Sequence, residues 1–177
     1  MGRLMRLLLV SGSTRAASGN TATLRTLAEV APPGDEFDLY DGLSALPAFN
    51  PDDDEPPLPP TVADLRSRIE AADAVVFCVP EYAGTIPGSL KNLLEWTVKG
   101  AQLSEKRVSW INVANLGRGD GAQANLEVVL GYVGAVVVGP ACLRTSVNGL
   151  SRSDRGTFVD PELRAQLGDI WKAFAET

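Results

Sequence analysis

The segment Gly12–Asn20, the first loop, holds residue types that could bind an anion. It reads Gly-Ser-Thr-Arg-Ala-Ala-Ser-Gly-Asn and joins an apolar run to an amphipathic one. The N-terminus of a helix presents unpaired backbone N–H groups and the positive end of a dipole, which suits a phosphate. The side-chain donors here are Ser13, Arg15, Ser18, Asn20 and the following Thr21. The alternative is an ordinary loop in which Ser18 or Asn20 caps the helix.

The segment Pro80–Gly88, the second loop, follows the most apolar run of the chain. Two prolines and two glycines favour an irregular backbone whose N–H and C=O groups cannot pair in a ladder. We expect those groups to be free to meet the polar edge of a planar ring, with Tyr82 offering a flat apolar face. The alternative is a rigid turn that leads into a helix beginning at Gly88 or Ser89.

The segment Asn115–Gly121, the third loop, has glycines at three alternate positions. Glycine lets the backbone approach a ligand closely. Arg118 could attract the phosphates of a ligand such as NADPH, or it could be a solvated loop arginine.

The composition excludes several kinds of catalysis. The 177-residue chain has no histidine, and its two cysteines, Cys78 and Cys142, are far apart, each within an apolar run. This removes Ser-His and Cys-His nucleophile pairs, the commonest metal ligand and a disulfide framework. We therefore expect no metal site and nominate no catalytic side chain. A cofactor would carry the chemistry if the protein is an enzyme.

Charge and hydropathy limit the partners. The net charge of −6 disfavours binding to nucleic acid or to anionic membranes, because phosphate groups are repelled. The apolar run Leu4–Val10 is too short for a signal core or a membrane span. We therefore expect a cytoplasmic protein.

Apolar runs and amphipathic stretches alternate along the chain. Five runs predict strands: Leu4–Val10, Glu36–Tyr40, Ala74–Val79, Val108–Ala114, and a fifth that starts at Ala135–Val138 and could reach Leu143. Five stretches predict helices: Asn20–Val30, Val62–Ala72, Gly88–Val98, Ala122–Val133 and Pro161–Ala175. This alternation predicts one α/β domain over residues 1–177. We expect a flavodoxin-like three-layer sandwich whose five-stranded parallel sheet has the order 2-1-3-4-5. In such sheets ligands bind beyond the carboxyl ends of the strands, where the three loops lie.

The segment Leu46–Pro60 differs from the rest. It holds six of the twelve prolines and the acidic run Asp52–Glu55, so we predict neither helix nor central strand there. An extended surface loop is expected, and a lid or an interface arm is the functional alternative.

These residues resemble those of a known family, the NADPH-dependent FMN reductases, which include flavin, quinone, azo-dye and chromate reductases. The first loop matches the family's Gly-Ser-x-Arg-x-x-Ser-x-Asn motif at Gly12, Ser13, Arg15, Ser18 and Asn20. The second loop matches Pro-Glu-Tyr-Asn at Pro80, Glu81 and Tyr82, and the chain continues into Pro87–Asn92, Glu95 and Trp96 as the family does. The third loop resembles the family's glycine-rich loop, and the resemblance runs over nearly the whole chain.

The resemblance implies a role for each loop. The FMN phosphate would be held by Ser13, Arg15, Ser18, Asn20 and Thr21. The isoalloxazine would be lined by Pro80, Glu81, Tyr82, Ala83 and Gly84, and bordered on its other edge by Asn115, Leu116 and Gly117. NADPH or NADH would be the co-substrate, and a flavin, quinone, azo compound or metal oxyanion would be the acceptor. Similar proteins form homodimers that often pair into tetramers.

The chain departs from the family pattern in two places. Ala83 stands where the family usually has Asn, which removes a side-chain amide from the flavin pocket. The residues Thr97–Lys99 follow Trp96, where an Arg near the dimer contact is common.

Two other interpretations stay open. A flavodoxin-like electron carrier would bind FMN without oxidising NAD(P)H. A non-redox domain would have kept the fold and lost the cofactor, and Ala83 is the only feature that favours it.

Overall fold

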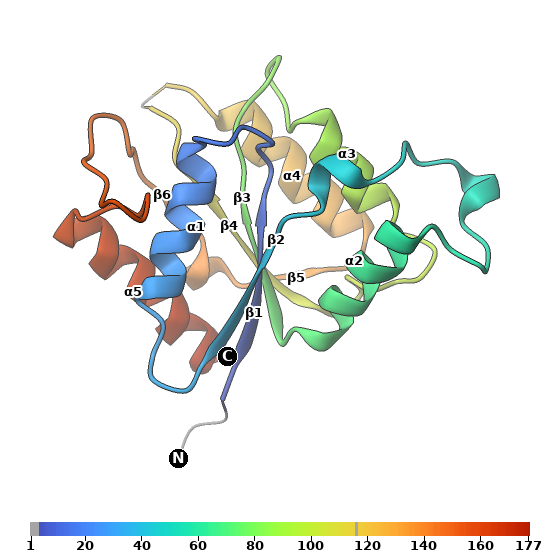
Figure 1. The fold of residues 1–177 in the computed structure, drawn as a ribbon, viewed down its shortest axis with the longest axis horizontal. Coiled ribbons are helices and arrows are strands. Elements are labelled where there is room, and N and C mark those ends of the chain that lie inside the picture. The colour runs from blue at the N-terminus through green and yellow to red at the C-terminus, as the bar shows by residue number, and fades with distance from the viewer. Residues whose placement is uncertain (1–3, 116) are drawn as a thin grey trace.

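The computed structural model describes residues 4–115 and 117–177 (Figure 1). Its sheet contains β1 (Arg6–Ser11), β2 (Glu36–Tyr40), β3 (Ala74–Cys78), β4 (Arg107–Asn112), β5 (Val136–Val137) and β6 (Leu143–Arg144). All strand pairs are parallel, in the order β2-β1-β3-β4-β5, and β6 also pairs with β4. The predicted order 2-1-3-4-5 is therefore confirmed.

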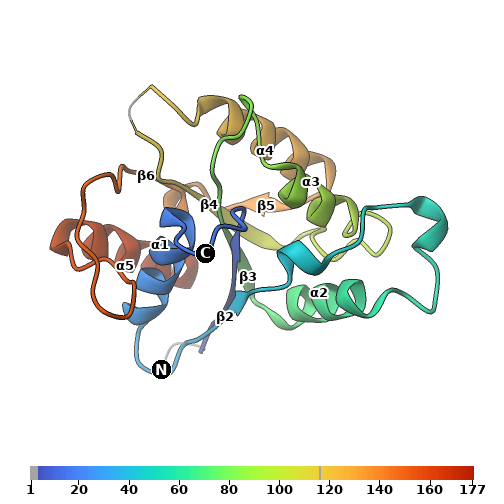
Figure 2. The same ribbon diagram turned by 45° about the horizontal axis from the view of Figure 1, so that its top comes forward.

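Helices cover both faces of this sheet, as Figures 1 and 2 show. One face carries α1 (Gly19–Glu29) and α5 (Pro161–Ala175). The other carries α2 (Pro60–Ala71), α3 (Gly88–Glu95) and α4 (Asp120–Tyr132). The five predicted helices are confirmed, with small shifts at their ends.

Alternate residues of the central strands enter different cores. Leu7 and Leu9 of β1 pack with α1 and α5, whereas Leu8 and Val10 pack with α2, α3 and α4. Every residue of β3 is buried, because helices cover both of its faces. This explains why β3 is an unbroken apolar run rather than an alternating one.

The carboxyl ends of the central strands meet at one edge of the sheet. Cys78 at the end of β3 pairs with Ser11 on one side and with Ile111 on the other. The first, second and third loops therefore start side by side, along the top of the molecule in Figure 1.

The position expected for a fifth strand is filled by two separate pieces. β5 pairs with the beginning of β4, and β6 pairs with its end. A short 3-10 helix, Gly139–Ala141, separates them. Pro140 fixes its own φ and has no N–H to donate, so the chain leaves the sheet here. The strand predicted to start within Ala135–Val138 is therefore present as β5, but it does not continue to Leu143.

The proline-rich segment Leu46–Pro60 contains helical structure, so the prediction that it has none is wrong. A 3-10 helix spans Pro51–Asp53, and α2 begins at Pro60. Proline is tolerated at the first helical position because its missing N–H would have no partner there.

Hydrogen bonds fasten this proline-rich segment to α2 and α3. Asn92 of α3 and Trp96, the C-cap residue of that helix, both donate to the carbonyl oxygen of Pro47, each at 2.9 Å. Farther along, the buried carboxylate of Asp54 accepts from Arg66 at 2.6 Å. The same guanidinium also donates to the carbonyl of Trp96. These contacts favour a fixed surface segment over a mobile lid.

Candidate functional site

The first loop leads into α1 and leaves several backbone donors unused. Ser18 is the N-cap of α1, and its hydroxyl accepts from the N–H groups of Asn20 at 3.2 Å and Thr21 at 3.5 Å. The capping alternative for Ser18 is therefore observed, although its own hydroxyl proton can still be donated. Within the described part of the chain, the N–H groups of Thr14, Ala16 and Ala17 have no acceptor. An anion at this loop would supply one.

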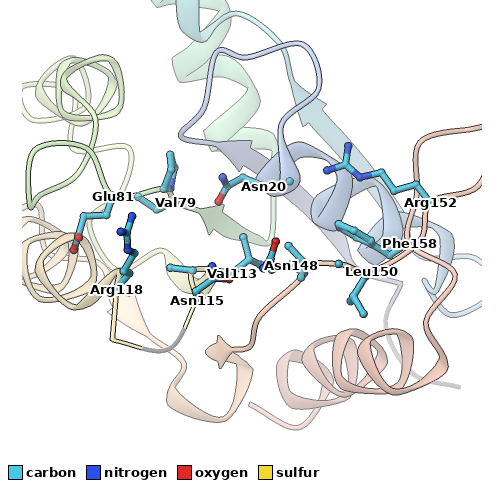
Figure 3. Close-up of a pocket in the computed structure, with 15 residues that line it drawn as sticks. Asn20, Val79, Glu81, Val113, Asn115, Arg118, Asn148, Leu150, Arg152 and Phe158 are labelled. Carbon is cyan, nitrogen blue, oxygen red and sulfur yellow. The ribbon is translucent and has the colours of Figure 1, made fainter.

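Asn20 provides a more specific indication that the site takes a polar ligand. Its side chain is 8% exposed, and its Oδ1 accepts from the thiol of Cys78 at 3.4 Å. Its amide nitrogen has no acceptor among the described residues, and Figure 3 shows the side chain at the wall of the pocket. This nitrogen opens into the pocket, where a polar ligand would accept its hydrogen bond. The donors of the first loop thus fit the phosphate and polar chain of FMN.

Two other residues predicted to bind phosphate have partners within the protein. The Thr21 hydroxyl donates to Ser11 Oγ at 2.9 Å. The Ser13 and Tyr82 hydroxyls lie 3.5 Å apart, so they link the first loop to the second. Arg15 is exposed and makes no ion pair among the residues described here.

The second loop is a tight two-residue hairpin. Tyr82 and Thr85 exchange both backbone hydrogen bonds, at 3.0 and 3.1 Å. The two central residues have positive φ, 51° at Ala83 and 77° at Gly84, as a type I′ turn requires. The expectation that this loop's backbone cannot pair is therefore wrong for Tyr82 and Thr85. The N–H groups of Ala83 and Gly84, at the exposed tip, have no acceptor among the described residues.

Glu81 ties the second loop to α4. Its Oε2 accepts from the N–H of Gly121 at 2.9 Å and of Ala122 at 3.2 Å. The N-cap of α4 is Gly119, which has no side chain to serve this purpose. A negative charge here also complements the positive end of the helix dipole. These two hydrogen bonds fix the orientation of the second loop relative to α4.

The second loop also packs directly against the backbone of α4. A Cβ built on Gly121 would lie 2.0 Å from the carbonyl oxygen of Gly84. Only glycine fits at this position, so the two loops are held in contact.

Two side chains, those of Asn112 and Arg144, hold the third loop in position through hydrogen bonds. Buried Asn112 accepts from the N–H of Ala114 at 3.1 Å and donates to the carbonyl of Gly119 at 3.0 Å. Arg144 of β6 donates to the carbonyl of Arg118 at 2.8 Å and pairs with Asp120. Asn115 accepts from Ser146 at 3.0 Å. Of the three predicted residues here, Leu116 lies outside the described residues.

A pocket of about 500 Å³ joins these loops. Of the predicted site residues, it brings together Asn20, Pro80, Glu81 and Asn115 (Figure 3). The residues Ser13, Arg15, Ser18, Thr21, Tyr82, Ala83, Gly84 and Gly117 are not part of its lining. Tyr82, Ala83 and Gly84 instead form the exposed tip beside it.

Sequence reasoning missed one whole side of this pocket. The segment Val147–Leu150 lines it, together with Arg152 and Phe158. A signal was present, because the chain after the fifth predicted strand must leave from the same edge of the sheet as the three loops. The Asn148-Gly149 pair also marks a turn there.

Both cysteines are free thiols whose reactivity is low. Complete burial raises the pKa of the Cys78 thiol far above its usual range. Burial also raises the pKa of Cys142. A raised pKa lowers the fraction of thiolate, which is the reactive form of a cysteine.

The described part of the chain contains neither a metal-binding cluster nor a helix that could span a membrane. No group of three or more His, Cys, Asp or Glu side chains is placed to hold a metal ion among residues 4–115 and 117–177. No helix in that part of the chain is long and apolar enough to cross a membrane.

Comparison with known proteins gives a consistent result. A family model described as NADPH-dependent FMN reductase matches residues 5–147. Quinone reductase from Escherichia coli (strain K12) is 32% identical over 182 residues, covering 99% of this chain and 96% of that protein. NAD(P)H-dependent FMN reductase PA1204 from Pseudomonas aeruginosa is 39% identical over 92 residues, or 52% of this chain and 49% of that protein.

A solved structure is similar over nearly its whole length. The flavoenzyme NAD(P)H:(acceptor) oxidoreductase FerB from Paracoccus denitrificans has a TM-score of 0.80 at 26% identity, and the match covers 98% of this chain and 96% of that one. The chain therefore belongs to the NADPH-dependent FMN reductase family, and it is an oxidoreductase with FMN as cofactor and NAD(P)H as co-substrate.

Proposed function

We propose that this chain passes hydride from NAD(P)H through FMN to a small acceptor, and that the three loops hold the flavin. One observation carries the assignment of the site: a single pocket joins the N-terminal end of α1 to the second and third loops. An elongated ligand with a phosphate at one end and a planar ring at the other fits this arrangement.

The phosphate end is assigned to the first loop. Arg15 and the Asn20 amide would bind it, together with the N–H groups of Thr14, Ala16 and Ala17, which have no acceptor in the described part of the chain. Ser13, Ser18 and Thr21 shape this end through the hydrogen bonds described above.

The ring end is assigned to the second and third loops. The hairpin of Tyr82, Ala83 and Gly84 would line one edge of the ring, and Pro80 and Glu81 its base. Asn115, with the predicted Leu116 and Gly117, would border the other edge. Rigid backbone N–H groups at such an edge would stabilise negative charge on the ring.

FMN supplies the hydride chemistry when it is bound, so the protein's task is positioning. Glu81 holds the second loop against α4, and Arg144 and Asn112 hold the third loop. No side chain is assigned as a catalytic acid or base.

The acceptor is proposed from the relatives' names. They include quinone reductases and an NADPH azoreductase from Bacillus sp. (strain OY1-2). Quinones and azo compounds are therefore the first acceptors to test, ahead of free flavin and metal oxyanions. Arg118 lines the pocket without an ion pair among the described residues, which favours NADPH over NADH.

We also propose that the protein forms a homodimer or a tetramer and that it lies in the cytoplasm. Val128 and Tyr132 lie one turn apart on α4 and are 57% and 89% exposed, which supports a homodimer or a tetramer. Two free thiols are consistent with the cytoplasm. We further propose that residues 1–177 form one domain, because the two cores share a single sheet.

The test is to load the purified protein with FMN, remove unbound flavin, and add NADPH without oxygen while the visible flavin band is recorded. We expect the band to bleach rapidly and to return when a benzoquinone is added. Retained flavin that neither NADPH nor NADH bleaches would establish the electron carrier instead. If no flavin is retained under any condition, the non-redox interpretation, with Ala83 as its cause, would replace the proposal.

A further inference from the structure

The side of the pocket that sequence reasoning missed is carried by a hairpin. Residues Ser151–Val159 fold back on themselves: the N–H of Ser153 donates to the carbonyl of Thr157 at 2.8 Å. Arg152 and Phe158 form an antiparallel bridge across the hairpin. The side-chain hydroxyls of Ser153 and Thr157 also lie within 2.7 Å. These contacts across the hairpin give the segment a defined structure.

The hairpin is fastened to the middle of α1. The N–H of Phe158 donates to Thr26 Oγ1 at 2.9 Å, and the Phe158 ring is 1% exposed. The Thr26 hydroxyl donates in turn to the carbonyl of Ala22 at 2.8 Å. The position of the hairpin along α1 is thus fixed.

This attachment brings Arg152 to the N-terminal end of α1. Its guanidinium stacks on the Phe158 ring at 5.0 Å from the centroid. Its Nη1 lies 3.5 Å from the carbonyl oxygen of Ala17 in the first loop. A Cβ placed on Gly19 would lie 3.8 Å from Nη2. Figure 3 shows the side chain reaching from the hairpin toward the Asn20 side of the pocket.

The charges around this point do not balance within the described chain. Arg152 and Arg15 make no ion pair there, and the first turn of α1 contains no acidic residue. The positive end of the α1 dipole adds to the two guanidinium charges. A guanidinium has five N–H donors, and Arg152 uses one of them within the described chain. An anion bound here would offset this positive charge and accept hydrogen bonds from the unused N–H groups.

A second observation points to the same ligand independently of the helix end. Asn20 as a residue is 8% exposed, and its side-chain nitrogen, which has no acceptor in the described chain, opens into the same pocket as Arg152. A phosphate monoester offers oxygens to both side chains, and arginine can bind it with two parallel hydrogen bonds.

We propose that Arg152 is a second phosphate-binding arginine of this site, in addition to Arg15. The inference rests on the proposed function, because its ligand is the phosphate monoester of a bound nucleotide. Two such groups are available to this enzyme, the 5′-phosphate of FMN and the 2′-phosphate of NADPH. Contact with Ala17 and Gly19 of the first loop favours the phosphate of FMN.

The test compares ligands that differ by one phosphate. Arg152→Gln is titrated with FMN and with riboflavin by flavin fluorescence, and its KM for NADPH and NADH is measured. The matched control is Arg155→Gln, because Arg155 lies in the same hairpin and does not line the pocket. Thermal unfolding of the apo proteins checks that both variants fold.

We expect Arg152→Gln to lose FMN affinity about 10- to 100-fold, as befits a charged hydrogen bond, with riboflavin affinity unchanged. Arg152→Lys should recover part of the loss. A raised KM for NADPH but not NADH would support the same residue acting on the other phosphate. The inference is overturned if Arg152→Gln matches Arg155→Gln with all four ligands, or if FMN and riboflavin weaken equally. Wild-type protein that retains no FMN would instead overturn the proposed function, and this inference with it.

Discussion

The first and second loops lie side by side at the same edge of the sheet and are built in opposite ways. The first loop leaves the N–H groups of Thr14, Ala16 and Ala17 without acceptors in the described chain. The second loop pairs Tyr82 with Thr85 and is fastened to α4 through Glu81. A loop with unpaired donors suits a ligand that supplies the missing acceptors, whereas a loop bonded to its neighbours suits a wall of fixed shape. Changes in the first loop should therefore affect binding, and changes in the second should affect stability.

The largest effect is expected from Arg15→Ala. Loss of a charged hydrogen bond to the FMN phosphate should weaken FMN binding by about 10- to 100-fold, equivalent to about 1.5–3 kcal/mol. The free energy of unfolding of the apo protein should stay within about 0.5 kcal/mol of wild type, because Arg15 is exposed and unpaired in the described chain. Flavin titration and urea denaturation measure the two quantities. Unchanged FMN affinity would show that the phosphate does not lie at this loop.

Glu81→Ala should change the free energy of unfolding, which Arg15→Ala should leave nearly unchanged. It leaves the N–H groups of Gly121 and Ala122 without their acceptor, which should lower the free energy of unfolding by about 1–3 kcal/mol. Glu81→Gln keeps an acceptor oxygen and should lose less. Urea denaturation of the apo proteins checks both variants. Wild-type stability in Glu81→Ala would contradict the role of Glu81 as a fastening between the second loop and α4.

The smallest effect is expected at Ala83. An L-residue with a Cβ is strained in the left-handed region, and Asn tolerates it better. Ala83→Asn should therefore raise the free energy of unfolding by about 1 kcal/mol. Ala101, with φ of 52° outside the three loops, is the matched control, and Ala101→Asn should stabilise similarly. A change in FMN affinity is expected only for Ala83→Asn. If Ala83→Asn lowers the free energy of unfolding, the left-handed backbone at Ala83 is not strained.

Much of this architecture could be predicted from sequence because its signals are local. The unbroken apolar run of β3 and the helical spacing of α5 indicated their elements directly. The position of the three loops followed from the rule that the carboxyl ends of parallel strands lie at the same edge of a sheet. The family motifs then assigned chemistry to the residues of those loops.

The features that the sequence did not predict depend on contacts between residues, which the composition of a single segment does not reveal. The positive φ of Ala83 depends on the pairing of Tyr82 with Thr85, which no propensity of alanine predicts. Arg152 lies more than a hundred residues from Ala17, and only the attachment of Phe158 to Thr26 brings them together. Glu81 lines the pocket, and the motif does not reveal that it also accepts hydrogen bonds from α4.

The break at Pro140 has a consequence for how the sheet meets other proteins. An edge strand with a long row of free N–H and C=O groups is a template on which another chain can add a strand and aggregate. Here that edge is divided into Val136–Val137 and Leu143–Arg144, two residues each. Neither piece is long enough to recruit a foreign strand, although Val136 and Val137 are both exposed. The break in the fifth strand thus protects this edge of the sheet, whereas the opposite edge is the continuous strand β2.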